Sequence, residues 1–140
     1  MPTGRTMAYA RHRDYAVLVH SPRAPSDAEW DAYLGRADEW LLELHGILVV
    51  SDGGGPTSSQ RRALKKLLAE KARHNASFAL ISPSLLARGI VLAINLFDPN
   101  IRAFRPEDVD QAFNFLRVPT AERQELLALA KRLREEIDAA

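Results

Sequence analysis

The sequence predicts an α/β domain: a mixed sheet of four to five strands packed with helices, plus one extra helix at the C-terminus. Short β-branched, apolar segments alternate with amphipathic segments of helical period, and the connections between them are short. The 140 residues are 46% hydrophobic and 26% charged, which is ordinary for a globular protein. A chain of this length suits one domain, and no internal repeat or long linker divides it.

The first half of the chain is expected to form a hairpin, a helix and a central strand. Tyr15–Ser21 (YAVLVHS) is a buried strand by its composition, and residues 5–11 before it can pair with it through a turn at His12–Asp14. Ser26 stands where a helix N-cap belongs. Gly46–Ser51 (GILVVS) is apolar on both faces, as in a covered parallel sheet. The helix between these strands has one apolar face, formed by Trp30, Tyr33, Leu34, Ala37, Leu41 and Leu44.

The second half repeats the alternation of helix and strand. Pro and Ser, Asp or Thr residues mark the starts of its helices. A helix with the inner face Leu64, Leu67, Leu68 and Ala72 is expected first, followed by a strand at Ser77–Ser82 and an apolar helix at 85–97. A short strand at Asn100–Arg105 and a brief helix carrying Val109, Ala112, Phe113 and Leu116 come next. The last element is a charged helix capped by Pro119-Thr120, and its apolar side consists of Leu126, Leu129, Ala130, Leu133 and Ile137.

The helix at 85–97 is apolar almost all round, which a helix on a sheet seldom is. Either the C-terminal helix covers its outer side, or that side meets another chain. The second alternative allows a homodimer or a self-associating subunit and makes Ile90, Leu92 and Ile94 interface residues. Trp40, at the edge of the apolar face of the first helix, is expected to be half exposed, a common position for an interface anchor.

Composition narrows the classes of function. The formal net charge of +1 gives no reason to expect nucleic-acid or membrane binding. The chain has no cysteine, which excludes disulfides and thiolate metal sites. No segment reaches the roughly 18 apolar residues needed to span a bilayer, and the N-terminus does not resemble a signal peptide. A cytoplasmic protein is therefore expected.

No enzyme signature is present. The four histidines (His12, His20, His45 and His74) show no metal-binding spacing, and His20 and His45, at strand edges, are expected to be surface or boundary residues. No Gly-x-Ser-x-Gly motif presents a nucleophile. We therefore predict no catalytic residue, no metal and no cofactor.

The stretch from Ile47 to Leu68 (ILVVSDGGGPTSSQRRALKKLL) carries the strongest functional signal. Three glycines permit a sharp turn after the strand, and Thr57 or Ser58 can cap the next helix. The same helix start favours an anion, either a phosphoryl group on a serine or a bound ligand. The spacing fits neither a Walker loop nor a dinucleotide motif. A capped turn, a phosphorylation switch and an anionic ligand all remain open.

The order hairpin, helix, strand, helix, strand, helix, strand, helix resembles the STAS domain of anti-sigma-factor antagonists, especially its SpoIIAA-like relatives. The resemblance covers about Met7 to Val118, so that residues 1–118 form the domain and the helix at 119–140 packs on it. In the signalling members an acidic residue ends a strand, and an Asp-Ser-Ser-Gly-Leu motif begins the next helix. Asp52 and Thr57-Ser58-Ser59 match this pattern, with Thr57 in place of the acid and Gln60-Arg61 in place of Gly-Leu.

The resemblance implies a non-enzymatic regulatory module that binds a protein partner, either a kinase or another regulator. Phosphorylation would occur at Ser58 or Ser59, with Thr57 beside them. The partner- or anion-binding loop would comprise Asp52, Gly53, Gly54, Gly55, Arg61 and Arg62. Some SpoIIAA-like proteins lack the serine motif, and their broader group resembles lipid-transfer domains. The alternative is therefore a binding domain for a lipid-like or anionic small molecule, bordered by the same loop or by the apolar helix.

Overall fold

The computed structural model describes residues 4–71, 73–96 and 98–139 and confirms the predicted fold class. Ala72 and Phe97, which the sequence placed on helix faces, lie outside the described residues. The strands are β1 (Met7–His12), β2 (Tyr15–His20), β3 (Gly46–Ser51), β4 (Ser77–Ile81) and β5 (Ile101–Phe104); the helices are α1 (Asp27–Trp40), α2 (Ser58–Glu70), α3 (Leu85–Asn95), α4 (Val109–Leu116), α5 (Thr120–Asp138) and a short 3-10 helix at Pro106–Asp108.

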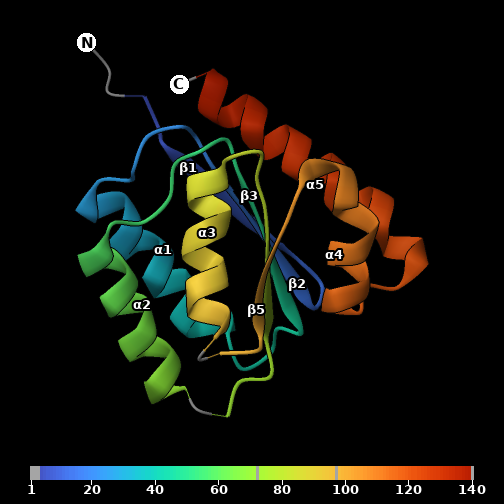
Figure 1. Cartoon of the computed structure of the whole chain (residues 1–140), viewed down its shortest axis with the longest axis horizontal. Helices are drawn as coiled ribbons and strands as arrows, with labels where there is room; N and C mark the ends of the chain where they lie inside the picture. Colours follow the sequence, from blue (N-terminus) through green and yellow to red (C-terminus); the bar gives the residue numbers. More distant parts are fainter. Residues whose placement is uncertain (1–3, 72, 97, 140) are drawn as a thin grey trace.

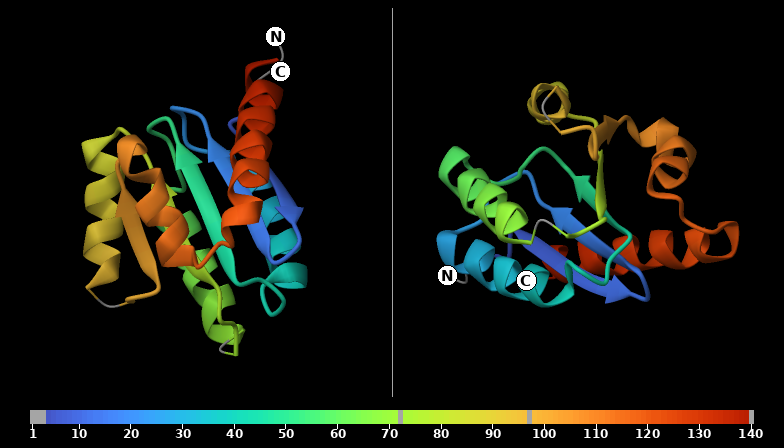
Figure 2. Two further views of the ribbon diagram at one scale, coloured as in Figure 1. Left: turned by 90° about the vertical axis from the view of Figure 1, so that its right-hand side faces the viewer. Right: turned by 90° about the horizontal axis from the view of Figure 1, so that it is seen from below.

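The sheet has the order β1-β2-β3-β4-β5, in which only the first pair is antiparallel. The predicted hairpin forms, with Arg13 in the left-handed conformation that its tight turn requires. Each parallel connection carries a helix. Because such crossovers share one hand, α1, α2 and α3 all lie on the same side of the sheet, and α4 and α5 lie on the other (Figures 1 and 2).

The α4/α5 face of the sheet is closed by a continuous apolar core. Phe113 of α4 and Leu126 of α5 are almost entirely buried against side chains of β1 to β5. The apolar stripe expected on the C-terminal helix is this inner face. The N-cap position of α5 is Pro119, and no side chain there makes a capping hydrogen bond, so the cap expected from Thr120 does not form.

On the opposite face, α1 packs closely over the first strands. Its start is fixed by a capping box, in which Ser26 and Glu29 each accept a bond from the other's backbone amide. Trp30 and Tyr33 are buried under the helix as expected. Leu41 and Leu44 are also buried, although α1 ends at Trp40 and both belong to the turn that follows.

Helix α3 is the exception on this face. It lies along β5 and the edge of β4, and none of its residues is buried. Leu85, Leu86, Leu92 and Leu96 are 65–79% exposed. Of the two alternatives for this helix, coverage by the C-terminal helix is wrong, because α5 buries its apolar stripe on the far side of the sheet against β1 and β2. That another chain covers this side stays a prediction.

Within the described ranges, no helix combines the length and the apolar character needed to cross a membrane.

Candidate functional site: an apolar cleft beside the β3–α2 loop

The glycine loop between β3 and α2 is built to pass close to another loop. Gly53 adopts a φ of +126°, which a side chain would oppose. A Cβ on Gly54 would stand 2.2 Å from the carbonyl oxygen of Ser21 and 2.4 Å from that of Arg23. The buried Ser51 holds the turn by accepting a bond from the amide of Gly53 and donating to the carbonyl of Gly54. The triple glycine therefore has a structural cause at two of its three positions.

The start of α2 is anchored by Gln60, which sequence reasoning treated only as a departure from a motif. Thr57 and Gln60 form a capping box, so Thr57 is the N-cap. The buried Gln60 amide also donates to the carbonyl of Pro25 and to the Asp27 carboxylate, and its backbone carbonyl accepts from the Trp30 indole at 2.9 Å. These bonds fasten α2 to the start of α1.

The predicted switch residues stand at this helix start. Ser58 and Ser59 are exposed in the first turn of α2. Arg61 reaches back along the helix, donating to the carbonyl of Pro56 at 2.9 Å and to the Ser58 hydroxyl at 3.0 Å. The structure thus brings one predicted arginine into contact with one predicted serine.

Asp52 faces away from these groups. Its carboxylate accepts a bond from Arg134 of α5 at 2.7 Å, so the residue joins the loop to the helix on the opposite face of the sheet. The resemblance placed Asp52 in one binding loop with Arg61 and Arg62, but the structure does not bring its carboxylate to these arginines or into the cleft beside them.

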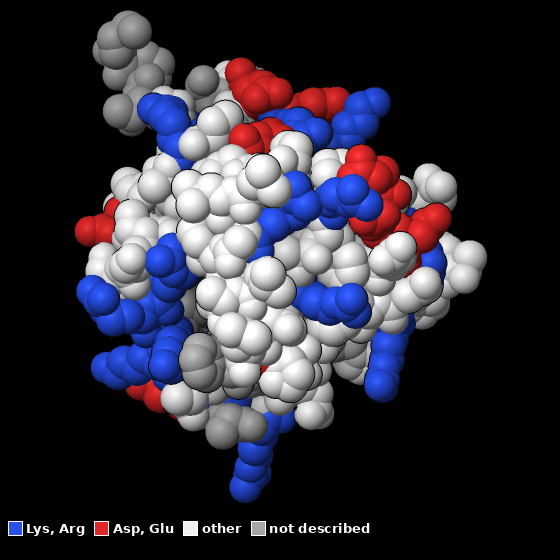
Figure 3. Space-filling view, in the orientation of Figure 1, with Lys and Arg blue, Asp and Glu red and all other residues white. Residues whose placement is uncertain are grey.

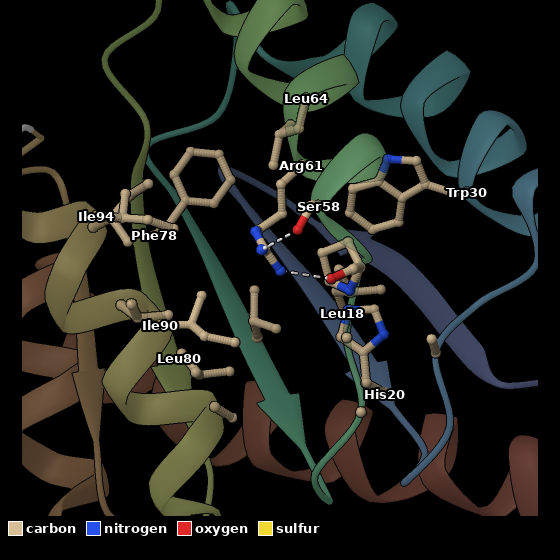
Figure 4. A pocket seen from close by; sticks show the side chains of 18 of the residues that line it. Leu18, His20, Trp30, Ser58, Arg61, Leu64, Phe78, Leu80, Ile90 and Ile94 are labelled. Carbon is tan, nitrogen blue, oxygen red and sulfur yellow. Dashed lines mark hydrogen bonds between the residues drawn. The ribbon is translucent and has the colours of Figure 1, made fainter.

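A cleft of about 880 Å³ lies between α2, α3 and the sheet, and it opens to solvent on one side. Its floor consists of apolar side chains of β2, β3 and β4, among them Leu18, Val49 and Leu80 (Figure 4). One wall is the inner side of α2, including Leu64, and the other is α3. The glycine loop, Ser58, Arg61 and Arg62 border it at the start of α2. The cleft exists because α3 stands at the sheet edge and leaves the floor between the two helices uncovered.

The predicted interface residues lie in three different places. Ile90 and Ile94 line the cleft. Leu92 points outward and is 65% exposed. Trp40 is half buried, as expected, but it lies at the end of α1, where it packs against the cluster that includes Leu41 and Leu44 of the following turn. Only Leu92 of this group remains on a free outer face.

His20 is a cleft residue that the sequence interpretation missed. It was expected to be a surface or boundary residue, but it is only 2% exposed at the end of β2, where its ring stacks on Trp30 with centroids 6.3 Å apart. Burial lowers the pKa of His20 to about 4, against a smaller opposing influence of the Glu29 charge. Its Nδ1 has no hydrogen-bond partner among the described residues. The sequence feature that could have indicated this burial is the place of His20 at the end of the apolar run YAVLVH, which forms a strand buried at every position.

Other chemistry is scarce in the described ranges. They hold no group of three or more His, Cys, Asp or Glu side chains that could bind a metal ion. Comparisons of the chain with models of known protein families, with curated proteins and with solved structures give no match. The resemblance to STAS domains therefore stays a prediction, and the site is interpreted from its own geometry.

Proposed function

We propose that this protein is a non-enzymatic binding domain that takes up a small, largely apolar molecule in the cleft between α2 and α3. The observation that supports this proposal is the cleft itself, whose volume of about 880 Å³ falls in the range of small-molecule sites and whose lining is mostly apolar. The cytoplasmic location expected from the sequence is part of the same proposal.

The physical reason for uptake is the uncovered apolar surface. Leu80 of the sheet and Ile90 and Ile94 of α3 face the cleft without a covering element (Figure 4). Removing such surface from water contributes roughly 25 cal/mol per Å². Figure 3 shows the pale, uncharged surface over α3, with Lys and Arg side chains gathered beside it toward α2. A ligand between the helices would cover the inner part of this surface.

The test uses the uncharged fluorescent probe N-phenyl-1-naphthylamine, whose emission rises in an apolar site. We expect saturable binding to the wild-type protein. Ile90→Asp places a charge in the cleft and should weaken probe binding at least about tenfold, because the carboxylate would be desolvated by the probe.

Leu92→Asp is the matched control, because it introduces the same charge two residues away on the outer side of α3. This variant should bind the probe like the wild type, and circular dichroism should show the same helix content in both variants. Absence of saturable binding to the wild type, or equal loss in both variants, contradicts the proposal.

A second candidate function is the regulatory interaction module, switched by phosphorylation at Ser58 or Ser59. It is favoured by the exposure of both hydroxyls at a helix start and by Arg61, 3.0 Å from the Ser58 hydroxyl and able to pair with a phosphoryl group. Thr57 is a weaker candidate for modification, because its hydroxyl already caps α2.

Phosphopeptide mapping of the protein isolated from its native host tests this candidate. It predicts a phosphoryl group on Ser58 or Ser59 that is lost in the corresponding Ser→Ala variant. Ser84, the N-cap of α3 and the counterpart of Thr57 in α2, serves as the control site at another helix start and should stay unmodified. A chain that carries no phosphoryl group at Ser58 or Ser59 in any growth condition contradicts the switch.

A further inference from the structure

We infer that the ligand of the cleft is an amphiphile with one anionic head group, which Arg61 holds at the start of α2 while the apolar body lies between α2 and α3. This inference rests on the proposed function and adds the chemical class of the ligand and its orientation. Two independent features support it: the unpaired charge of Arg61, and the unpartnered imidazole of His20 at the same end of the cleft.

Arg61 is a fixed cation at the border of an apolar cavity. Its guanidinium donates to two neutral acceptors, the carbonyl of Pro56 and the hydroxyl of Ser58. Within the described part of the chain, no carboxylate oxygen lies within 4.0 Å of it. A guanidinium has five N–H donors, so donors remain for a ligand, and their planar arrangement matches a carboxylate or phosphate. The two bonds to Pro56 and Ser58 set the direction of the group before any ligand arrives.

The charges around the cleft are distributed unevenly along it. Arg62 and Lys65 also line the α2 side, and the N-terminus of α2 adds the positive end of a helix dipole. The acidic residue of the lining is Asp98. It precedes β5 and so lies near the N-terminal ends of the parallel strands, whereas α2 starts near their C-terminal ends. An anionic head is therefore favoured at the α2 start and disfavoured at the other end.

His20 adds a polar group at the favoured end. It closes β2, in register with Ser51, where β3 ends and the loop to α2 begins. The ring lines the cleft, is more than nine-tenths buried, and leaves Nδ1 without a partner in the described structure. Nδ1 itself is shut off from solvent, so a ligand reaches it only when the ring turns toward the cleft; a polar atom left without a hydrogen bond is unfavourable, and a ligand that supplies one gains affinity. Because burial keeps the ring neutral near pH 7, His20 would bond to the head group or its neighbouring atoms without adding charge.

The experiment compares head groups on one apolar chain by displacement of N-phenyl-1-naphthylamine. Dodecanoate, dodecyl phosphate, methyl dodecanoate and dodecyltrimethylammonium are titrated below their aggregation concentrations. We expect at least one of the two anions to displace the probe at a concentration about tenfold lower than the ester or the cation. The two anions together show whether the head group is a carboxylate or a phosphate.

Variants assign this preference to residues. Arg61→Gln should remove most of the advantage of the anion over the ester while probe affinity is kept, and Arg61→Lys should restore part of it. Arg62→Gln is the matched control and should reduce the advantage by less than about threefold, because Arg62 is exposed at the rim. His20→Phe keeps a ring beside Trp30 and should weaken anion binding severalfold without weakening the probe.

The failures of the two proposals can be told apart. If the probe binds but anion, ester and cation displace it equally, or if Arg61→Gln leaves their order unchanged, the inference about the head group is overturned and the apolar site stands. If anion binding is unchanged in His20→Phe, the role of His20 is overturned. If the probe does not bind at all, the cleft proposal and this inference both fail.

Discussion

The two faces of the sheet differ in how completely they are covered. On one face, α4 and α5 bury their apolar stripes, and Leu126 is 0% exposed. On the other, α3 has no buried residue, and Leu92 is 65% exposed. The central strands β2 and β3 are apolar on both faces, so the difference follows from where the helices lie. An apolar helix can therefore close a core or border an open cleft, and its sequence does not decide which.

The largest expected effect comes from the same substitution on the two faces. Leu126→Ala removes a side chain from the closed core and should lower the free energy of unfolding by about 2–5 kcal/mol. Leu92→Ala removes an exposed side chain on α3 and should change it by less than about 0.5 kcal/mol. Urea unfolding of the two variants measures both values. Equal losses would show that α3 is covered in solution, and a small loss for Leu126→Ala would show that α5 is not part of the core.

A second prediction concerns acid stability and depends on the burial of His20 under the cleft. The folded protein binds a proton on His20 only near pH 4, whereas the unfolded chain binds it near the ordinary value of 6.5. Protonation therefore favours the unfolded chain, and stability falls as pH drops from 6.5 to 4, by on the order of 3 kcal/mol from this group. Nearby Glu29 opposes part of the shift.

His20→Gln removes this titration and should make the loss of stability between pH 6.5 and 4 smaller than in the wild type. The measurement is the free energy of urea unfolding at several pH values in this window. An identical pH dependence in both proteins would mean that His20 is not held neutral, and the description of the cleft floor would then be wrong.

The third prediction tests the loop that borders the cleft. Gly54→Ala should destabilise the fold by about 1–3 kcal/mol, because its Cβ would meet backbone carbonyls that cannot turn aside. Gly55→Ala, one position later, meets nothing within 4 Å and should be neutral or stabilise by up to about 1 kcal/mol. Thermal unfolding of both variants measures the two changes in stability. Equal changes would show that the two loops do not approach each other as described.

The smallest effect is expected at the ion pair between Asp52 and Arg134, which joins the loop to the closed face. Both side chains are more than a third exposed, so water and salt screen the pair. Arg134→Met should lower the free energy of unfolding by less than about 1 kcal/mol, and less still in high salt. A larger or salt-independent loss would give this bond a structural role that its exposure does not predict.

Local patterns in the sequence predicted most of the fold. The apolar run of β2, the helix signal at Ser26 and the alternation of strand and helix depend on neighbours in the chain, and each is present in the structure. The capping of α2 was foreseen in the same way, because Thr57 acts within one helical turn.

The candidate site depends on contacts between distant segments, and the sequence could not supply these. That α5 lies on the face opposite α3 follows from the path of the chain after β5. His20 was taken for a boundary residue because the packing of Trp30, ten positions later, decides its burial. Asp52 was assigned to the partner- or anion-binding loop, although its carboxylate bonds to Arg134, 82 residues away.

The most direct measurement of the difference between the two faces is a methyl NMR titration with N-phenyl-1-naphthylamine. The methyl signals of Leu18, Val49, Leu80 and Ile90, which line the cleft, should shift progressively and reach saturation. Those of Leu126 and Leu129, in the closed core on the far side of the sheet, should stay in place. Shifts confined to the closed core, or spread equally over both faces, would contradict a ligand site between α2 and α3.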